Sequence, residues 1–233
     1  MSTVSETLTD AAVAAADPIQ TLEWAARRFG DDVFASSSFQ TQSMPLLHMI
    51  STAVPHMSVV FIDTGFHFPQ TLEFRDEVVR RFNLDLVIVS PSWSRDRFLQ
   101  QNGELYSSAP DACCHMNKVS PMQHYLASKK AWVTGVRKDQ TTYRNTLCPI
   151  EISTDGVVRI APLLYWGADE IDRYIERYDL PRHPLGELGY PSIGCAPCTE
   201  TATPERYTRD GRWPGLAKTE CGLHHQWNAK RTT

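Results

Sequence analysis

The sequence predicts an α/β fold built on a mostly parallel, doubly wound sheet. Short apolar runs rich in β-branched residues alternate with helical patterns along the chain. Such alternation is typical of parallel sheets, because each parallel strand reaches the next through a crossover helix. The chain has 233 residues, enough to bury one sizeable core. Ligands of such sheets bind at the carboxyl ends of the strands.

Four runs have the composition of strands and five have the periodicity of helices. The expected strands are Val33–Ser37, Ser58–Asp63, Asp85–Ser90 and Ala131–Val136. The expected helices are Asp17–Phe29, Gln42–Ile50, Pro69–Phe82, Val119–Lys129 and Ala168–Tyr178. Pro69 suits the first turn of a helix, where the missing amide proton would have no partner in the helix anyway. Residues 181–220 are rich in Pro, Gly and Arg, which predicts an irregular segment lying over the site.

Composition limits the partners and the location. The net charge is -4, which argues against nucleic acid or a membrane surface as a partner. No apolar run approaches the ~20 residues that span a bilayer. Residues 1–17 contain no Lys or Arg and no long apolar core, so we expect no secretory signal and a cytoplasmic location. We expect a flexible N-terminus (1–17), an α/β domain (18–202) and a C-terminal tail (203–233).

Two polar segments follow expected strands. Ser36–Ser43 lies between a strand and a helix, where backbone amides and hydroxyls can bind an anion. It contains no glycine run of the kind that marks a phosphate loop, so a Ser-rich helix cap is the alternative. Asp63–Gly65 is the second segment, which by itself fits a plain turn equally well.

Cations gather in two places. Thr134–Gln140 ends a strand in a basic loop that contains Arg137, with Arg144 just beyond. Arginine can engage two oxygens of a phosphate or sulfate, although a solvated charged loop is the alternative. Residues 203–233 hold six Lys and Arg against three Asp and Glu, opposite in sign to the whole chain.

Four of the six cysteines form two pairs, Cys113-Cys114 and Cys195-x-x-Cys198. Adjacent cysteines can both reach a compact cluster from a helix start or a kink. Four thiolates suit an iron–sulfur cluster or a zinc ion in a reducing compartment, and four unrelated buried thiols are the remaining alternative. Cys148 precedes a proline and has no partner by spacing, so we interpret it as structural.

Cys221 lies in the basic tail, next to Gly222. Neighbouring cations depress the pKa of a cysteine and make its thiolate available at neutral pH. The sequence therefore predicts a nucleophile, and an incidental thiol near the terminus is the alternative. His224, taken alone, is more typical of a surface histidine.

Four motifs in order resemble the assimilatory sulfonucleotide reductases, which are the adenylyl-sulfate and phosphoadenylyl-sulfate reductases. The motifs are Cys113–Val119, Thr134–Gln140, Gly189–Thr199 and Glu220–His224. The similarity runs from about Val33 to about His224. It implies a Rossmann-like adenine-nucleotide α-hydrolase fold, with Cys221 as the catalytic residue. It also implies one 4Fe-4S cluster per chain, held by Cys113, Cys114, Cys195 and Cys198. The residues that we expect to bind substrate are Ser36, Ser37, Ser38, Asp63, Thr64, Gly65, Lys118, Arg137, Arg144, Arg209, Arg212 and His224.

The resemblance implies a reaction in which the Cys221 thiolate attacks the sulfate sulfur, AMP departs and an S-sulfocysteine remains. Thioredoxin or glutaredoxin then releases sulfite by thiol–disulfide-type exchange. In this family the cluster is not thought to pass electrons to the substrate. A homo-oligomer is possible.

Substrate choice rests on conflicting features. The loop Ser36–Ser43 is closer to phosphoadenylyl-sulfate enzymes, whereas the complete cysteine set is closer to adenylyl-sulfate enzymes. Thr141–Tyr143 departs from the commoner Ser-Pro turn. We favour adenylyl sulfate, with phosphoadenylyl sulfate as the alternative. Two rivals are an ATP-using thiolation enzyme, which would carry a Ser-Gly-Gly loop, and a zinc-stabilised nucleotide-binding module without catalysis.

Overall fold

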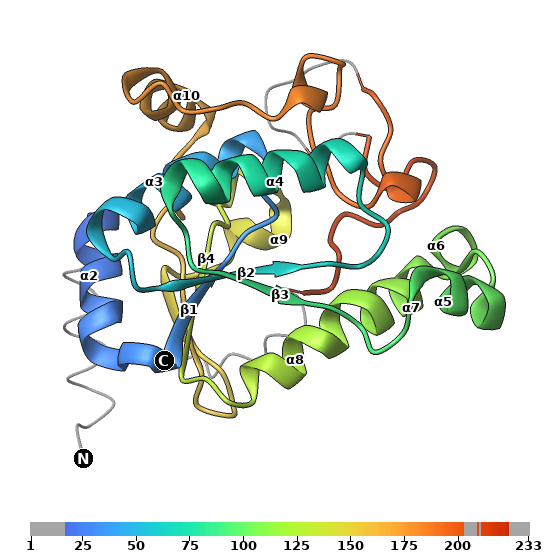
Figure 1. Ribbon diagram of the computed structural model, residues 1–233, viewed down its shortest axis with the longest axis horizontal. Coiled ribbons are helices and arrows are strands. Elements are labelled where there is room, and N and C mark those ends of the chain that lie inside the picture. The colour runs from blue at the N-terminus through green and yellow to red at the C-terminus, as the bar shows by residue number, and fades with distance from the viewer. Residues whose placement is uncertain (1–16, 203–208, 210, 224–233) are drawn as a thin grey trace.

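A sheet of six strands lies at the centre of the part of the chain that the computed structural model describes, residues 17–202, 209 and 211–223 (Figure 1). Its spatial order is β3-β2-β1-β4-β6-β5, and every pairing is parallel except that of β5 with β6. The strands are β1 (Val33–Ser36), β2 (Ser58–Ile62), β3 (Leu86–Val89), β4 (Ala131–Thr134), β5 (Ile150–Ile152) and β6 (Val158–Ile160). The expected α/β class and mostly parallel sheet are confirmed.

The sequence analysis missed the hairpin of β5 and β6. Each strand has only three residues, shorter than the runs that reveal a strand by periodicity. Asp155-Gly156 between them is a typical hairpin turn, and Gly156 has a φ of 85°. That dipeptide was the signal available in the sequence.

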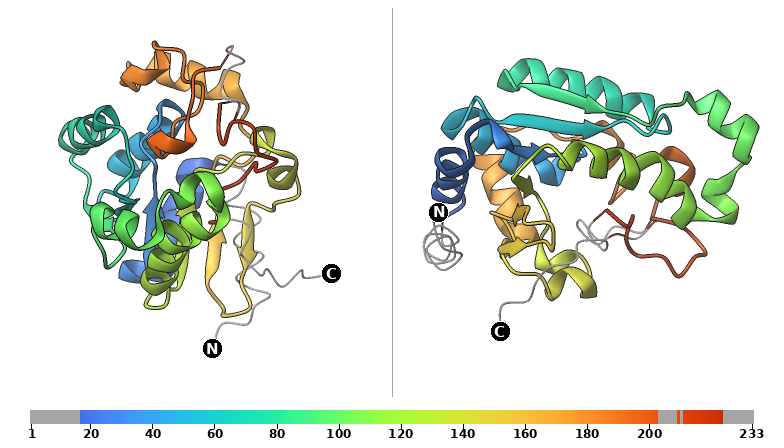
Figure 2. Two further views of the ribbon diagram at one scale, coloured as in Figure 1. Left: turned by 90° about the vertical axis from the view of Figure 1, so that its right-hand side faces the viewer. Right: turned by 90° about the horizontal axis from the view of Figure 1, so that it is seen from below.

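Helices cover both faces of the sheet (Figures 1 and 2). The α-helices are α2 (Pro18–Phe29), α3 (Met44–Ala53), α4 (Pro69–Phe82), α5 (Arg95–Asn102), α6 (Leu105–Ser108), α7 (Pro110–Cys114), α8 (Ser120–Leu126), α9 (Thr142–Asn145) and α10 (Ala168–Arg177). Helix α4 has the bounds that the sequence predicts. Helix α2 begins after Asp17, whose carboxylate accepts a hydrogen bond from the backbone N–H of Ile19 at 2.8 Å.

Alternation of side chains along the strands divides the core in two. Val33 and Ala35 of β1 pack on one face with buried residues of α2, α3, α4 and α10. Phe34 lies on the other face with Trp132 and with Met122 of α8. Successive strand residues point to opposite faces, so both faces of this sheet are buried, as parallel sheets require.

Cys113 and Cys114 lie where α7 passes into a π-helical turn, His115–Val119, which then continues as α8. A π turn adds a residue to the helical turn and often lies at a functional site. Of the two positions that the adjacent cysteines predict, a helix start or a kink, the structure has them beside a kink. The expected helix Val119–Lys129 corresponds to α8 and ends at Leu126.

The segment after α10 is irregular, as expected. It contains two short 3₁₀ turns, Pro184–Gly186 and Ala196–Cys198. An isolated bridge pairs Cys195 with His67, in the loop after β2, and so ties this segment to the edge formed by the strand ends. The three-part domain division remains a prediction, because residues 1–16, 203–208, 210 and 224–233 lie outside the described chain. None of the described helices is long and apolar enough to cross a membrane.

Candidate active site

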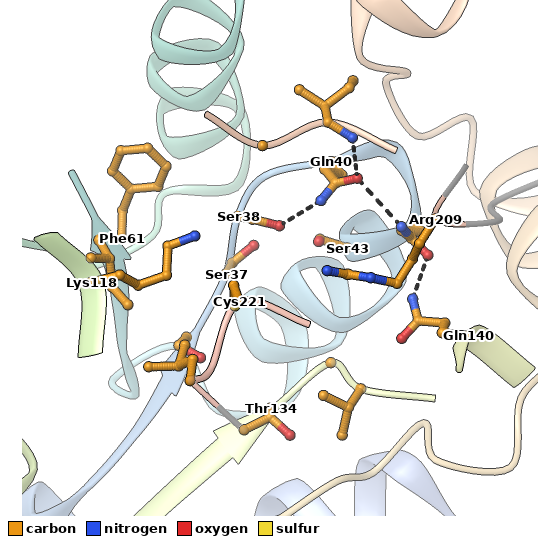
Figure 3. A pocket seen from close by; sticks show the side chains of 18 of the residues that line it. Ser37, Ser38, Gln40, Ser43, Phe61, Lys118, Thr134, Gln140, Arg209 and Cys221 are labelled. Carbon is orange, nitrogen blue, oxygen red and sulfur yellow. Dashed lines mark hydrogen bonds between the residues drawn. The ribbon is translucent and has the colours of Figure 1, made fainter. Parts of the chain in front are cut away.

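A cleft opens at the carboxyl ends of β1, β2 and β4, where Ser36, Ile62 and Thr134 line it (Figure 3). It holds about 1090 Å³ of atom-free space, its open mouth included, a size that suits a small-molecule ligand. Its lining cations are Lys118, Arg144, Arg209 and Arg212. Among the described residues that line it, none is Asp or Glu. A cleft with one sign of charge concentrates ligands of the opposite sign, so this one favours an anion.

The segment after β1 forms one wall of the cleft, which includes Ser36, Ser37 and Ser38. The indole N–H of Trp132 donates to Ser36 Oγ at 2.8 Å, and the backbone N–H of Phe39 donates to Ser37 Oγ at 3.0 Å. These two hydroxyls thus hold the turn that precedes α3. All three serines line the cleft, and none of them caps the 3₁₀ turn Thr41–Ser43 or helix α3, so the structure does not support the helix-cap alternative for them.

The first three residues of the loop after β2 lie outside the cleft lining, although the sequence predicted them at the ligand. Asp63, Thr64 and Gly65 are not among the residues that line the cleft. Gly65 donates its backbone N–H to Asp63 Oδ1 at 2.9 Å and has a φ of 75°, which closes a tight turn. Buried Thr64 instead places Oγ1 3.3 Å from Cys195 Sγ. The geometry therefore associates this loop with the paired cysteines.

Arg137 also lies behind the cleft wall and does not line it. Its buried guanidinium donates to both carboxylate oxygens of Asp139 at 3.0 Å and to Gln42 Oε1 at 2.8 Å. Gln42 and Gln140 do line the cleft. Because the Asp139 carboxylate engages two of its N–H groups, Arg137 is placed to orient Gln42, which the sequence analysis did not single out.

Glu220 is the acidic residue beside the cleft that sequence reasoning missed. Its buried carboxylate accepts from Arg144 Nε at 2.7 Å and Arg144 Nη2 at 2.9 Å, and from Thr141 Oγ1 at 2.9 Å. Arg209 Nη2 lies 3.8 Å from the same carboxylate. Burial alone would raise the pKa of Glu220, but the two arginines hold it below its ordinary value. The only signal in the sequence was its position before Cys221.

Cys221 lines the cleft together with Lys118. Figure 3 shows Lys118, Ser37, Ser38 and Cys221 converging on the same space, with Arg209 pointing in from the opposite side. Burial opposes ionisation of Cys221, but the charges of Lys118 and Arg209 lower the pKa of the thiol below its ordinary value. Burial likewise opposes the charge of Lys118, while the thiolates of Cys221, Cys195 and Cys114 raise the pKa of its ammonium. The site therefore favours a thiolate facing an ammonium ion.

Thr134 and Arg212 are two further polar residues that line the cleft. Thr134 Oγ1, at the end of β4, is buried and has no hydrogen-bond partner among the described residues, so it is available to a ligand. Arg212 donates from Nε to the carbonyl oxygen of Cys198 at 3.3 Å. A Cβ on Gly194 would lie 2.2 Å from Arg212 Nη2, so only glycine lets this guanidinium lie there.

The paired cysteines lie beside the cleft, next to Lys118. Cys113 Sγ lies 3.7 Å from Asn117 Nδ2. Burial is the main cause that raises the pKa of Cys114 to about 12 and that of Cys198 to about 11. These thiols carry protons unless cations neutralise them. In the described part of the chain, no three His, Cys, Asp or Glu side chains are grouped as ligands of a single metal ion.

Comparison with known proteins identifies the family. Residues 32–201 match the phosphoadenosine phosphosulfate reductase domain. The chain belongs to this reductase family. Adenosine 5'-phosphosulfate reductases from Bacillus mycoides and Salinibacter ruber are 37% and 38% identical to it, over 89% of this chain and 90% and 83% of their own lengths. The resemblance read from the four motifs is confirmed, and so is the expected class of enzyme, an oxidoreductase.

Solved structures agree with the fold of this reductase. A phosphoadenylyl-sulfate reductase from Candida auris in a phosphate complex superposes with a TM-score of 0.73 at 28% identity, covering 87% of this chain and 99% of that chain. An FMN adenylyltransferase from Candida glabrata superposes with a TM-score of 0.61 at 16% identity, covering 86% and 68%. The second likeness shows the fold alone.

In this sulfonucleotide reductase the cleft brings together most of the expected ligand-binding residues. It gathers Ser36, Ser37, Ser38, Lys118, Arg144, Arg209, Arg212 and Cys221. It leaves out Asp63, Thr64, Gly65 and Arg137 for the reasons above. His224 lies outside the described residues.

Proposed function

We propose that this protein is an adenylyl-sulfate reductase that uses thioredoxin or glutaredoxin as its reductant. The observation that carries the proposal is the position of Cys221, a thiol with a lowered pKa, in the cleft that Ser36–Ser38 and Lys118 also line. A nucleophile, an ammonium group and anion-binding hydroxyls are the groups needed to transfer a sulfuryl group from a nucleotide. The curated relatives carry the name of the same activity.

In the first step, the Cys221 thiolate attacks the sulfur of the nucleotide's sulfate. An S–S bond forms, the S–O bond to phosphate breaks, and AMP leaves with the electron pair of that bond. The product on the enzyme is an S-sulfocysteine. In the second step, a thiolate of the reductant attacks the Cys221 sulfur, and sulfite departs with the electron pair of the S–S bond. The second thiol of the reductant then closes its disulfide and restores Cys221.

Cations of the cleft lower the barrier to the first step, because two anions must approach each other. Lys118 faces the thiolate, and Arg212 is held beside Gly194, where none of the described residues that line the cleft is a carboxylate. Fixed positive groups stabilise the charge that develops on the leaving phosphate, at no cost of reorientation during the reaction. The free hydroxyl of Thr134 is a further donor or acceptor for the nucleotide.

We also propose that Cys113, Cys114, Cys195 and Cys198 hold one 4Fe-4S cluster. A four-iron cluster takes one thiolate per iron, so its cysteines need not converge on a single point as four zinc ligands do. A hydroxyl beside a thiol suits a sulfur acceptor, and Thr64 Oγ1 lies 3.3 Å from Cys195 Sγ. Trp213, whose backbone N–H donates to the carbonyl oxygen of Cys198 at 3.1 Å, has a buried indole N–H with no partner among the described residues. When bound, the cluster would supply a compact charge near Lys118 and would tie α7 to the irregular segment.

Substrate preference is tested by sulfite release with reduced thioredoxin on anaerobically purified protein. We expect kcat/KM for adenylyl sulfate to exceed that for phosphoadenylyl sulfate by about tenfold or more, a difference of about 1.4 kcal/mol. The 3'-phosphate adds about two negative charges, while Arg144 and Arg209 already share the Glu220 carboxylate. A preference for phosphoadenylyl sulfate would reverse the substrate assignment, and no sulfite from either would refute the proposed activity.

Cys195→Ser is expected to lose bound iron and the visible absorption of thiolate-bound iron, since the serine oxygen is a harder and poorer ligand. Cys148→Ser is the matched control, because Cys148 is exposed and lies outside the pairs. The measurement is the iron and zinc content together with the absorption spectrum. Unchanged iron in Cys195→Ser would remove this residue from the ligand set, and stoichiometric zinc in the unaltered protein would replace the cluster by a zinc site.

These reactions consume a reduced dithiol and use unprotected thiols, which suits a reducing compartment such as the cytoplasm.

A further inference from the structure

We propose that Glu220 is a positioning residue, a clasp that holds Cys221 in the cleft through its buried ion pair with Arg144 and must open between the two half-reactions. This inference rests on the two-step function proposed above. It concerns a residue that is adjacent to the nucleophile in sequence and contacts Arg144, another residue that lines the cleft.

The contacts of Glu220 account for both of its carboxylate oxygens. Arg144 donates to each of them, at 2.7 Å and 2.9 Å, and Thr141 Oγ1 donates to Oε1. Both partners are part of or next to α9, 76 to 79 residues earlier in the chain. The paired side chains of Arg144 and Glu220 are 7% and 2% exposed. A bidentate, buried pair of this kind fixes the geometry of the backbone on both sides.

The Arg144–Glu220 ion pair is buried and lies next to Cys221 in the chain. The neighbouring pair in the same segment joins Lys218 to Asp111, whose side chain is 88% exposed. Exposed pairs contribute little to stability, whereas removing one partner of a buried pair leaves a desolvated charge and is strongly unfavourable. Gly222, with a φ of 82°, then turns the chain immediately after Cys221. The backbone is therefore fixed by the ion pair of Glu220 before the nucleophile, and it turns sharply at Gly222 after the nucleophile.

The same pair also sets the electrostatics of the cleft. Arg144 lines the cleft, and Gln140 accepts a hydrogen bond from its Nη1. Glu220 thus orients Arg144 toward Gln140 and shares its charge with Arg209, whose Nε donates to the carbonyl oxygen of Thr219 at 2.9 Å. Two arginines hold the chain at 219 and 220, directly before the thiolate.

The second half-reaction requires a different position of this segment. Cys221 faces Lys118 inside the cleft, while the dithiol that regenerates it belongs to a protein too large to enter. The S-sulfocysteine must move outward to meet it, and Glu220 is its direct neighbour in the chain. The Arg144–Glu220 pair must therefore break on each turnover.

Glu220→Gln keeps the size and some hydrogen bonding of the side chain but removes the carboxylate that faces buried Arg144 and half-buried Arg209. Matched Glu200→Gln removes an exposed carboxylate from the irregular segment. Cluster-loaded protein is treated with iodoacetamide, and peptide mass spectrometry compares the labelling of Cys221 with that of exposed Cys148 in the same molecule. Rates are compared at high pH, where Cys221 is fully ionised, so that a change in its pKa does not enter.

We expect Glu220→Gln to raise the labelling rate of Cys221 about tenfold or more and to leave the labelling rate of Cys148 unchanged. In Glu200→Gln, the labelling rates of both cysteines should stay unchanged. Single-turnover AMP release should slow about tenfold or more, while thioredoxin should reduce preformed S-sulfocysteine at least as fast as in the unaltered protein. Arg144→Gln should have the same effects, and the double variant should be no worse than either single variant.

Labelling of Cys221 that stays unchanged in Glu220→Gln, or equal slowing of both half-reactions, would overturn the clasp. If Glu220→Gln does not fold, Glu220→Asp keeps the charge but shortens the reach, and its Cys221 labelling must still rise. Failure of the unaltered protein to form S-sulfocysteine would refute the proposed function, and the labelling comparison would still decide the role of Glu220.

Discussion

Cys221→Ser is expected to lose sulfite formation by about 10⁴-fold or more, the scale on which removal of a nucleophile acts. A serine hydroxyl ionises far above neutral pH and cannot form the S–S bond that the first step requires. Thiol chemistry at this position depends on Lys118 and Arg209, which lower the pKa of Cys221 but could not ionise an alcohol. The measurement is single-turnover AMP release together with sulfite release under thioredoxin.

Cys148→Ser is the control for this substitution, because Cys148 is exposed and does not line the cleft. It should retain full activity. Cys221→Ser should also keep its iron and its affinity for the nucleotide, because Cys221 is not among the paired cysteines. Substantial turnover by Cys221→Ser would exclude the covalent mechanism.

Lys118→Met is expected to lower kcat by about 10²- to 10³-fold, the effect of removing one fixed charge from a transition state. It should also move the pH profile. Lys118 holds the pKa of Cys221 below its ordinary value, so the thiolate form persists to lower pH in the unaltered protein. Without the ammonium group, burial raises that pKa, and the rising limb of kcat/KM shifts to higher pH.

The measurement is kcat/KM against pH for adenylyl sulfate in both proteins. Lys129→Met is the matched control, because its ammonium donates to the carbonyl oxygen of Asp31 at the amino ends of β1 and β4, whereas the cleft opens at their carboxyl ends. Arg209→Met should give a shift in the same direction, since Arg209 also lowers the pKa of Cys221. A rising limb at the same pH in Lys118→Met would show that Lys118 does not stabilise the thiolate.

Local patterns were sufficient for much of the fold. Helix α4 was predicted with its correct bounds, because Pro69 begins it and its apolar residues repeat with helical spacing. The strands β1, β2 and β4 were predicted within one or two residues, and their carboxyl ends form the cleft as expected. The adjacent pair Cys113-Cys114 predicted a helix start or a kink, and a π turn follows it.

Other features depended on which neighbours a residue meets in space. Arg137 was expected at the ligand, but Asp139 and Gln42 hold it behind the wall. Thr64 was expected beside the nucleotide, but the bridge between His67 and Cys195 brings it to a thiol. Neither outcome follows from the residues adjacent in sequence.

The sequence alone determined the chemistry that this protein carries, namely paired thiols and a nucleophile among cations, and it determined the alternation of β1–β4 with helices. These are local properties, since side-chain type and hydrophobic period act over a few residues. Only the tertiary structure decided which of the cations face the cleft and that Glu220 holds Arg144 beside Cys221. That pair joins positions 76 residues apart, and its strength comes from burial, which only the packed chain provides.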